Sequence, residues 1–318
     1  MAELPMECEV WSPCKINPTL EVLGRRADGM HEVVTTLLAL DLCDRVRVRR
    51  YRSELDSVEL RLTCSGPAHS ADIPMDARNL AWRGAQVVLD LAAQRGMDLA
   101  GLGVELQIEK HVPSQAGLGG GSSNAAAAAY GLTRLLGLDC DDPELHTRLG
   151  LLGADVAFFL AARRSGWGLC RGRGERVQAL ELPAMDERVF VIWTPRATCS
   201  TGAVYAALRP EEMHAKVRTE RFNTCLSAPL EEARAACIND LEAAAGRVHS
   251  ELNELRGALE SMGPGVAGLC GSGSSFFGMF NSHEEAQGFL LKAGIKRIER
   301  DFGLRAQFIA RARGAGVG

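Results

Sequence analysis

The segment PSQAGLGGGSSNAA at residues 113–126 holds four glycines followed by two serines, and it is the most unusual stretch of the chain. Residues 102–108 alternate before it as a strand does. Residues 124–136 are strong helix formers, and we expect their helix to begin where the glycines end. Glycines let backbone N–H groups approach an anion, and a helix start adds unpaired donors and partial positive charge. This order of strand, glycine loop and helix therefore predicts a phosphate-binding site.

Two common nucleotide-binding patterns do not fit the chain. The P-loop needs a Gly-Lys pair followed by Ser or Thr, and the sequence has no Gly-Lys pair. Gly263, Gly265 and Gly268 match the letters of the dinucleotide fingerprint, but they follow a helical pattern and lead into a strand, which is the reverse order. A flexible turn is the alternative interpretation of residues 117–121.

Four further segments accompany the glycine loop: SPCKIN at 12–17, GRRADGMHE at 24–32, GADV at 153–156 and GSGS at 271–274. Together with residues 113–126, and in this order, they resemble the motifs of the GHMP kinase superfamily, in the form found in its diphosphocytidyl-methylerythritol kinases. The resemblance extends from residue 12 to about residue 280. Only the segment at 24–32 separates this form from homoserine or mevalonate kinases.

The resemblance implies a two-domain α+β fold, with an N-terminal half like ribosomal protein S5 domain 2 and a ferredoxin-like C-terminal half. We expect the domains at residues 1–178 and 179–318. The resemblance also implies that ATP, with Mg²⁺, phosphorylates the 2-hydroxyl of a small-molecule substrate, 4-diphosphocytidyl-2-C-methyl-D-erythritol. That reaction belongs to non-mevalonate isoprenoid biosynthesis.

Two residues carry the implied chemistry. Asp155 matches the family's general base, and Lys15 matches a lysine that holds this carboxylate ionised and orients the acceptor hydroxyl. Without the other motifs, Asp155 would be interpreted as a capping residue and Lys15 as a surface charge. Only five of the 36 basic residues are lysines, which favours positions for Lys15 and Lys110 where the planar arginine group does not fit.

The other site residues also follow from the resemblance. For ATP they are Asn79, Lys110, Pro113, Gly117, Leu118, Gly119, Gly120, Gly121, Ser122, Ser123 and Asn124, with Asn79 and Lys110 near the adenosine. For the second substrate they are Asn17, Met30, His31, Tyr205, Gly271, Ser272 and Gly273. Asn17 would contact the methylerythritol part, His31 the cytosine edge and Tyr205 the face of the base. Ser123 is the candidate for Mg²⁺ or β-phosphate contact, and helix capping by Ser122 and Ser123 is the alternative.

Two positions depart from the family pattern. Met30 stands where the family usually has a tyrosine that would sandwich the cytosine against Tyr205. Gln115 replaces a common glycine at the loop entrance, where we expect little effect because it precedes the tight turn.

The composition limits other functions. A net charge of −4 and the alternation of arginine with Val and Tyr at residues 45–52 argue against nucleic acid as a partner. Ten cysteines without a C-x-x-C pair suggest neither a disulfide framework nor a zinc site. Without a long apolar run or a signal pattern at residues 1–8, we expect a cytoplasmic protein, a monomer or weak homodimer, with no membrane partner.

The periodicity of the chain predicts its remaining elements. Strands are expected at 10–23, 33–49, 166–174, 189–193, 266–270, 276–280 and 304–309, and helices at 80–91, 143–149, 252–262 and 284–291. The first two strands should pair antiparallel across the turn-rich residues 24–29. We expect no long parallel crossovers, which favours the α+β class.

Two alternatives remain open at this level. One is another GHMP kinase acting on homoserine or mevalonate, which would have no use for the cytosine-reading segment that contains Arg26, Asp28 and His31. The other is a non-catalytic nucleotide-binding module, which would lose Lys15 or Asp155.

Overall fold

The computed structural model describes residues 6–181, 188–214, 217, 228–263 and 265–313. The elements of its first part are β1 (Glu7–Arg25), β2 (His31–Arg52), β3 (Glu59–Ser65), α1 (Leu80–Gln94), β4 (Leu102–Glu109), α2 (Gly120–Leu136), α3 (Pro143–Gly150), α4 (Ala154–Ala161), β5 (Trp167–Gly172) and β6 (Arg176–Ala179). Then follow β7 (Val189–Thr194), α5 (Thr201–Ala206), η1 (Pro210–Glu212), α7 (Leu230–Ala236), β8 (Ile238–Asn239), α8 (Glu242–Val248), α9 (Glu251–Ser261), β9 (Val266–Leu269), β10 (Phe276–Phe280), α10 (His283–Leu290), α11 (Ala293–Asp301) and β11 (Ala306–Arg311).

Two long antiparallel strands form the frame of the first sheet. β1 and β2 have 19 and 22 residues, and β2 is long enough to pair with β4 along one half and with β5 along the other. The strand order is β3-β4-β2-β1-β8, with β5 and β6 continuing from β2. β8 joins this sheet from the second half of the chain, by parallel pairing with Thr19 and Leu20 of β1.

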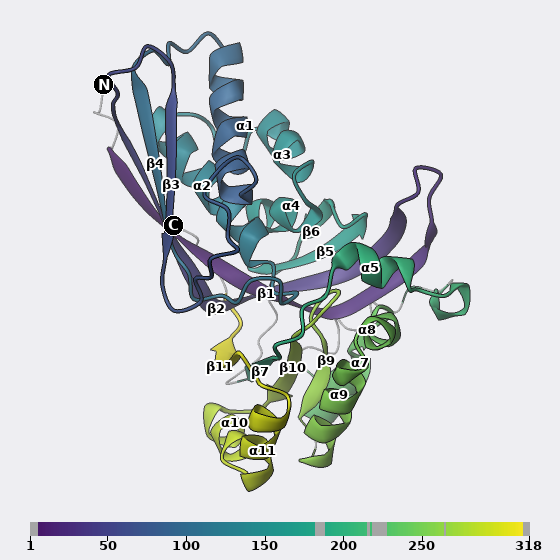
Figure 1. Cartoon of the computed structure of the whole chain (residues 1–318). Coiled ribbons are helices and arrows are strands. Elements are labelled where there is room, and N and C mark those ends of the chain that lie inside the picture. Colours follow the sequence, from purple (N-terminus) through teal and green to yellow (C-terminus); the bar gives the residue numbers. More distant parts are fainter. Residues whose placement is uncertain (1–5, 182–187, 215–216, 218–227, 264, 314–318) are drawn as a thin grey trace.

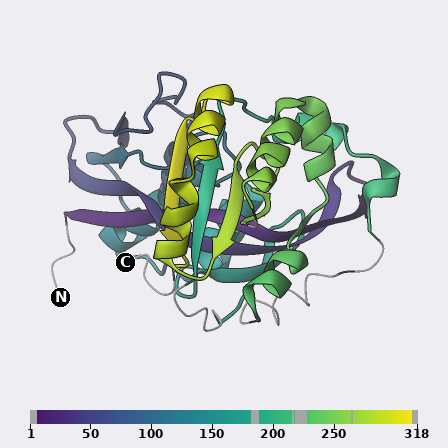
Figure 2. The same ribbon diagram turned by 90° about the horizontal axis from the view of Figure 1, so that it is seen from below.

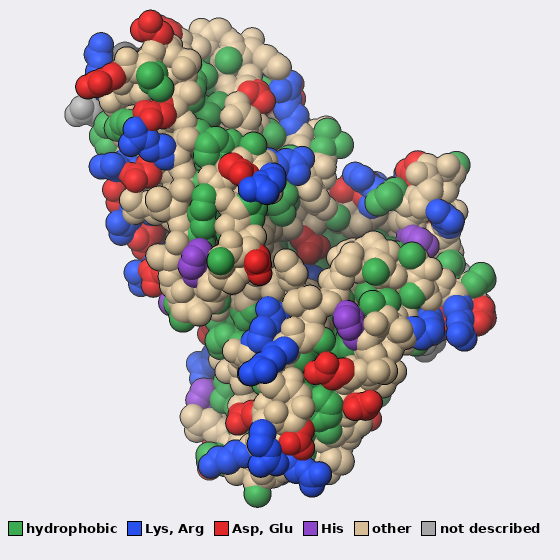
Figure 3. Space-filling view, viewed as in Figure 1, with side chains coloured by type: hydrophobic (Ala, Val, Ile, Leu, Met, Phe, Trp, Pro, Cys, Tyr) green, Lys and Arg blue, Asp and Glu red, His purple; other side chains and the backbone are tan. Residues whose placement is uncertain are grey.

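Helices α1 to α4 cover one face of this sheet (Figure 1). The alanine-rich helix α2 is buried almost throughout, and it packs closely on α1 because a Cβ at Gly84 would lie 2.4 Å from the carbonyl oxygen of Ala125. The other face carries ion pairs such as those of Arg47 with Glu7 and Glu9, at 3.2 and 3.3 Å. Figure 3 shows basic and acidic side chains interleaved along this side of the molecule, at the left of the view.

The second sheet has the order β11-β7-β10-β9, with every pair antiparallel. Numbered along the chain, this is the order 4-1-3-2 of a ferredoxin-like domain. The side chains of β7 point alternately into two hydrophobic cores, one on each face of this sheet. Val189, Val191 and Trp193 face helices such as α9 and α10, whereas Phe190 and Ile192 pack against Ile16 and Leu38 of the first sheet.

Figure 2 shows the result of this packing, with the strands of the second sheet crossing the long β1 and β2. The two sheets therefore share a core, and the loops of the second domain reach the helix side of the first. The boundary at residue 178 stays a prediction, since β6 crosses that position and the next described strand starts at Val189.

The structure confirms the predicted strands and helices to within a few residues at their ends, including the antiparallel pairing of β1 with β2. Two expectations were wrong. Helix α2 begins at Gly120 and not at Asn124, because Gly119 adopts a left-handed conformation (φ 71°) that starts the helix inside the glycine run. Parallel crossovers exist in both sheets. β3 and β4 are parallel neighbours joined through α1, and in the second sheet β7 leads to β9, and β10 to β11, through helices, each pair lying on either side of an antiparallel strand.

Several elements had no sequence prediction: β3, β6, β8, α4, α5, η1, α7, α8 and α11, which are short or lack a clear pattern. In the part of the chain that the structure describes, no helix combines the length and apolar character needed to cross a bilayer.

Candidate active site

One cavity of about 1330 Å³ lies where the glycine loop, the β1–β2 hairpin and the second domain meet. Of the residues predicted from the sequence, it is lined by Lys15, Asn17, Met30, His31, Asn79, Lys110, Pro113, Gly117, Leu118, Gly119, Gly120, Gly121, Ser122, Asn124, Asp155, Tyr205, Gly271 and Ser272. Ser123 and Gly273 are not part of its wall. The cavity is large enough for two ligands of nucleotide size.

The glycine loop ends at the start of α2 with its first turn open to the cavity. The first helical hydrogen bond runs from the Ser123 N–H to the Gly119 carbonyl oxygen, at 2.9 Å. The N–H groups of Gly120, Gly121 and Ser122 thus have no partner within the helix, which is the donor arrangement that a phosphate needs. Because Gly119 is the N-cap and makes no side-chain cap bond, neither Ser122 nor Ser123 caps this helix.

The second domain holds the entrance of the glycine loop. Gly117 has φ 76°, and a Cβ there would lie 2.0 Å from the carbonyl oxygen of Cys270. The Ser275 N–H also donates to the Ala116 carbonyl oxygen at 3.1 Å. Only glycine allows this approach of two backbones, so the segment at residues 271–274 and the glycine loop form one wall.

Lys15 and Asp155 meet in front of this loop. The Lys15 ammonium lies 3.5 Å from an Asp155 carboxylate oxygen, with the lysine side chain 4% exposed and the aspartate 33% exposed. The backbone N–H of Lys15 donates a hydrogen bond of 2.9 Å to the Leu118 carbonyl oxygen, which connects β1 to the glycine loop. The N-cap of α4 is Gly153, and Asp155 lies in the first turn, where the helix dipole favours a carboxylate.

Asn17 orients the lysine from the same strand. Its side-chain oxygen accepts a hydrogen bond of 2.8 Å from Lys15 Nζ, and its amide donates to Thr35 Oγ1 at 3.0 Å. The Thr35 hydroxyl in turn donates to the Thr19 carbonyl oxygen at 2.6 Å. A buried polar chain across β1 and β2 therefore fixes the ammonium group.

Two rings lie at the other end of the cavity. His31 and Tyr205 have ring centroids 5.0 Å apart and planes inclined at 31°. Burial, and to a smaller extent the Arg25 guanidinium, lowers the pKa of His31 from its ordinary 6.5, so the ring is mainly neutral at pH 7 and offers one donor and one acceptor. Burial, and then the Asp155 carboxylate, raises the pKa of Tyr205 to about 12, which keeps its phenol protonated.

Comparison with known proteins places this arrangement in a family. The GHMP kinases N terminal domain matches residues 79–163, and the GHMP kinases C terminal domain matches residues 222–296. The 4-diphosphocytidyl-2-C-methyl-D-erythritol kinase of Syntrophotalea carbinolica is 34% identical over 278 residues, which are 87% of this chain and 90% of that protein. The kinase of the same name from Thermus thermophilus is 35% identical over 87% of this chain and 89% of that protein.

The chain belongs to the 4-diphosphocytidyl-2-C-methyl-D-erythritol kinases. A crystal structure of 4-(cytidine 5'-diphospho)-2C-methyl-D-erythritol kinase superposes on 96% of the chain with a TM-score of 0.73 and 32% identity, and all of that chain is covered. Homoserine kinase from Cytophaga hutchinsonii superposes with a TM-score of 0.70 at 17% identity, over 99% of this chain and 98% of that one. The second likeness shows a shared fold alone.

In this diphosphocytidyl-methylerythritol kinase, a buried acid outside the predicted site residues supports the wall of the cavity beside the glycine loop. Asp44 of β2 is fully buried and pairs with Lys110. Its other oxygen accepts hydrogen bonds from the N–H groups of His111 and Val112, at 2.7 and 2.8 Å. Asp44 thus shapes the segment between β4 and the glycine loop, and it neutralises the lysine that we expected near the adenosine. No sequence signal singles out Asp44, because Asp41 lies in the same stretch of β2 and Arg45 follows directly.

The hydroxyl of Ser123 is buried in the protein and hydrogen-bonded to another side chain. It accepts a hydrogen bond of 2.8 Å from the Ser12 hydroxyl, and the side chain is 1% exposed. Asn124 also donates to Ser12 and to Asp44, at 2.8 and 2.9 Å. Ser122, one residue earlier, lines the cavity. Gly273 lies behind the wall, where a Cβ would lie 3.3 Å from Leu269 and 3.4 Å from Cys199.

Several further cavity residues had no sequence signal of their own. Arg25 and Arg173 line the end that contains His31, and Arg78 lines the end that contains Asn79. With Lys15 and Lys110 they make the wall of the cavity predominantly basic, since its acidic members are Asp72 and Asp155. A wall of this kind suits ligands with several phosphate groups.

The departure at Gln115 has a conformational cost. Gln115 adopts φ 53°, and it is the one non-glycine residue with positive φ in the described part of the chain. This conformation explains a glycine at this position in related proteins, because glycine has no Cβ to be strained there.

Proposed function

We propose that this protein transfers the γ-phosphoryl group of ATP to the 2-hydroxyl of 4-diphosphocytidyl-2-C-methyl-D-erythritol. The contact between Lys15 and Asp155 carries the proposal, because it lies in front of a helix start that has free N–H donors. The names of the relatives support the choice of substrate.

In the proposed reaction, the glycine loop and the first turn of α2 hold the phosphates of ATP. The Asp155 carboxylate takes the proton of the 2-hydroxyl while that oxygen forms a bond to the γ-phosphorus. The bond from the γ-phosphorus to the bridging oxygen breaks, and ADP leaves. Lys15, whose ammonium lies 3.5 Å from the Asp155 carboxylate, balances the charge on the phosphoryl oxygens as the group passes.

The residues at the loop are compatible with Mg²⁺, which prefers oxygen ligands and shares them with phosphates. Ser122 lines the cavity, and a Cβ at Gly153, two residues before Asp155, would lie 3.8 Å from the Ser122 hydroxyl oxygen. The Ser122 hydroxyl would hold the ion, whereas the Ser123 hydroxyl already has Ser12 as a partner. When bound, Mg²⁺ supplies positive charge to the β- and γ-phosphate oxygens.

At the other end of the cavity, His31 would read the edge of the cytosine and Tyr205 would stack on its face. Asn17 would contact the methylerythritol part beside Lys15. A cytoplasmic location and a monomeric or weakly dimeric state stay predictions.

The test is an ADP-release assay of the purified protein with ATP and Mg²⁺. It compares 4-diphosphocytidyl-2-C-methyl-D-erythritol with homoserine and mevalonate, and ³¹P NMR locates the new phosphate. Turnover of the cytidine substrate alone is expected. Turnover of homoserine or mevalonate alone would overturn the substrate, and ATP binding without any turnover would indicate a nucleotide-binding module.

Asp155→Asn supplies the matched control of that assay. The amide is nearly isosteric but takes up no proton, so we expect turnover to fall by roughly 10²-fold or more while ATP affinity is retained. Calorimetry with ATP checks the binding. Unchanged turnover would reduce Asp155 to a structural residue of α4.

A further inference from the structure

Two turns stand side by side at the end of the cavity that contains His31. The β1–β2 turn contributes Gly29 and Met30 to the wall, and the β5–β6 turn contributes Arg173 and Gly174. Their strands are paired up to Val33 and Gly172, and beyond that pair the turns have no ladder hydrogen bonds to each other. Side-chain contacts must therefore set the distance between them.

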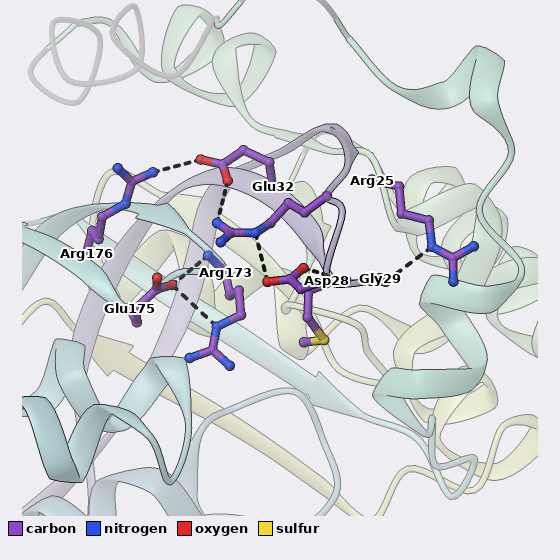
Figure 4. Close-up of polar contacts among 9 residues, drawn as sticks. Arg25, Asp28, Gly29, Glu32, Arg173, Glu175 and Arg176 are labelled. Atoms are coloured by element: carbon purple, nitrogen blue, oxygen red, sulfur yellow. Dashed lines mark hydrogen bonds and ion pairs between the residues drawn. The ribbon is translucent and has the colours of Figure 1, made fainter.

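Glu32 makes these contacts (Figure 4). One of its carboxylate oxygens accepts a hydrogen bond of 2.9 Å from Arg26 Nη1, in the β1–β2 turn. The other accepts one of 2.8 Å from Arg176 Nη2, at the start of β6. The Glu32 carboxylate thus bonds to the β1–β2 hairpin through one oxygen and to the β5–β6 hairpin through the other.

The contact continues through the turn to the substrate residues. Arg26 Nε donates to Asp28 at 3.2 Å, and the other Asp28 oxygen accepts the N–H of Met30 at 3.0 Å. The Arg26 N–H also donates to the Met30 carbonyl oxygen at 2.7 Å. A continuous set of hydrogen bonds therefore runs from Arg176, through Glu32, to the residue next to His31.

We infer that Glu32 is a positioning residue of the cytidine site, which joins the two turns so that Met30 and His31 are held over the cavity. The inference rests on the proposed function, because that function makes this end of the cavity the substrate site. Glu32 itself is not among the cavity residues, so it acts through the turn and not by touching the substrate.

The size of the effect follows from the exposure of the network. Arg26, Glu32 and Arg176 are 37%, 31% and 64% exposed, so each ion pair is weak by itself. Two such pairs on one carboxylate predict a rise of about three- to tenfold in the KM for the cytidine substrate when the charge is removed. The kcat and the KM for ATP should not change, since Lys15, Asp155 and the glycine loop are untouched.

The test compares Glu32→Gln with the matched control Asp301→Asn. Asp301 is also an exposed carboxylate with two arginine partners, Arg297 and Arg300, at 3.1 and 3.2 Å, but it lies on α11 and not at the cavity. Both substitutions remove one charge at almost constant shape. The KM for the cytidine substrate is expected to rise in Glu32→Gln and not in Asp301→Asn, with Tm reporting on folding.

Two further readouts separate positioning from general stability. Added salt should raise the KM of the wild-type enzyme toward that of Glu32→Gln and should change the variant less. Arg176→Gln should raise the KM in the same direction, and the double variant should show less than the product of the two effects.

The outcomes are distinct for the two proposals. Wild-type KM in Glu32→Gln, or an equal fall in kcat, overturns the role of Glu32 while the proposed function stands. A wild-type enzyme that does not phosphorylate the cytidine substrate overturns the proposed function, and the inference with it.

Discussion

The shape of the space around Lys15 explains why a lysine is found there in a chain that otherwise uses arginine. A Cβ at Gly119 would lie 3.0 Å from Lys15 Cγ, and a Cβ at Gly271 would lie 3.0 Å from Lys15 Nζ. The side chain therefore passes between two glycines and ends in a compact ammonium group. A planar guanidinium has no room in this passage.

Lys15→Arg should therefore lower kcat by about 10²-fold, because displacement of a catalytic group by about 1 Å has an effect of that size. The charge is conserved, so the loss would come from geometry. Steady-state kinetics measures the effect, and Tm checks that the variant is folded. A fully active variant would mean that Lys15 is a buried structural charge without a catalytic role.

Met30 is the residue at which the chain departs most clearly from the family pattern. It lines the cavity beside His31 and is 48% exposed. A thioether on an aromatic ring contributes about 0.3–1.5 kcal/mol, whereas base stacking on an aromatic side chain contributes about 1–3 kcal/mol. Met30→Tyr should lower the KM for the cytidine substrate by up to about tenfold and leave the KM for ATP unchanged.

Tyr205→Ala provides the check on the predicted sandwich. In this structure the ring next to Tyr205 is that of His31. Whether Met30 and Tyr205 bind the same cytosine must therefore be tested by measuring whether the effects of the two substitutions depend on each other. The gain from Met30→Tyr should shrink in the Tyr205→Ala background when Kd values are compared in a double-mutant cycle. Strict additivity would mean that the two residues do not bind the same base.

At the scale of elements, the start of α2 depends on the different roles of neighbouring glycines. Gly119 has φ 71° and lies against Lys15 and Phe159. Gly121 lies within the helix, and a Cβ added there would have Leu80 Cδ1 as its nearest neighbour, at 3.6 Å, which is an ordinary contact distance. Gly119 is therefore required by the backbone, whereas an alanine would fit at Gly121.

Gly119→Ala should destabilise the protein by about 1–2 kcal/mol, because an alanine is strained in the left-handed region, and it should lower kcat by displacing Lys15. Gly121→Ala should raise the stability by up to about 1 kcal/mol, because alanine favours a helix. Chemical denaturation measures both changes. Equal losses in the two variants would contradict this division of roles.

The sequence predicted this element well because its signals are local. The spacing of alanines and leucines after residue 124 indicates a helix, and the glycines indicate an anion site. The start of the helix was misplaced by four residues because glycine is a poor helix former, and only the conformation of Gly119 shows that Gly120 already belongs to α2.

At the scale of the whole molecule, the second domain supports the entrance of the glycine loop through Arg305. Its Nη1 donates to the Ser114 carbonyl oxygen at 3.2 Å, and its Nε donates to the Pro195 carbonyl oxygen at 2.9 Å. Burial lowers the pKa of Arg305. This side chain joins the edge of the second sheet to the entrance of the glycine loop, next to the strained Gln115.

Arg305→Ala should destabilise the protein by about 1–2 kcal/mol, because two carbonyl groups lose a charged donor. It should also raise the KM for ATP several-fold while the KM for the cytidine substrate stays constant. Arg311→Ala, at the exposed far end of β11, is the control and should change neither constant. A KM for ATP that stays at the wild-type value would show that the loop is held without Arg305.

The sequence by itself determined the class of fold, through the periodicity of its segments, and it determined the glycine loop and the family motifs, because each motif is a contiguous stretch of residues. It also indicated Lys15 and Asp155 through those motifs. Only the tertiary structure decided which groups meet: Asp44 with Lys110, Ser12 with Ser123, Glu32 with Arg176, and Arg305 with the glycine loop. These partners are separated by 66 to 191 residues, and no local pattern connects them. Their contacts depend on how β1 and β2 bend and on how the second sheet packs beneath them, which follows from the burial of both cores together.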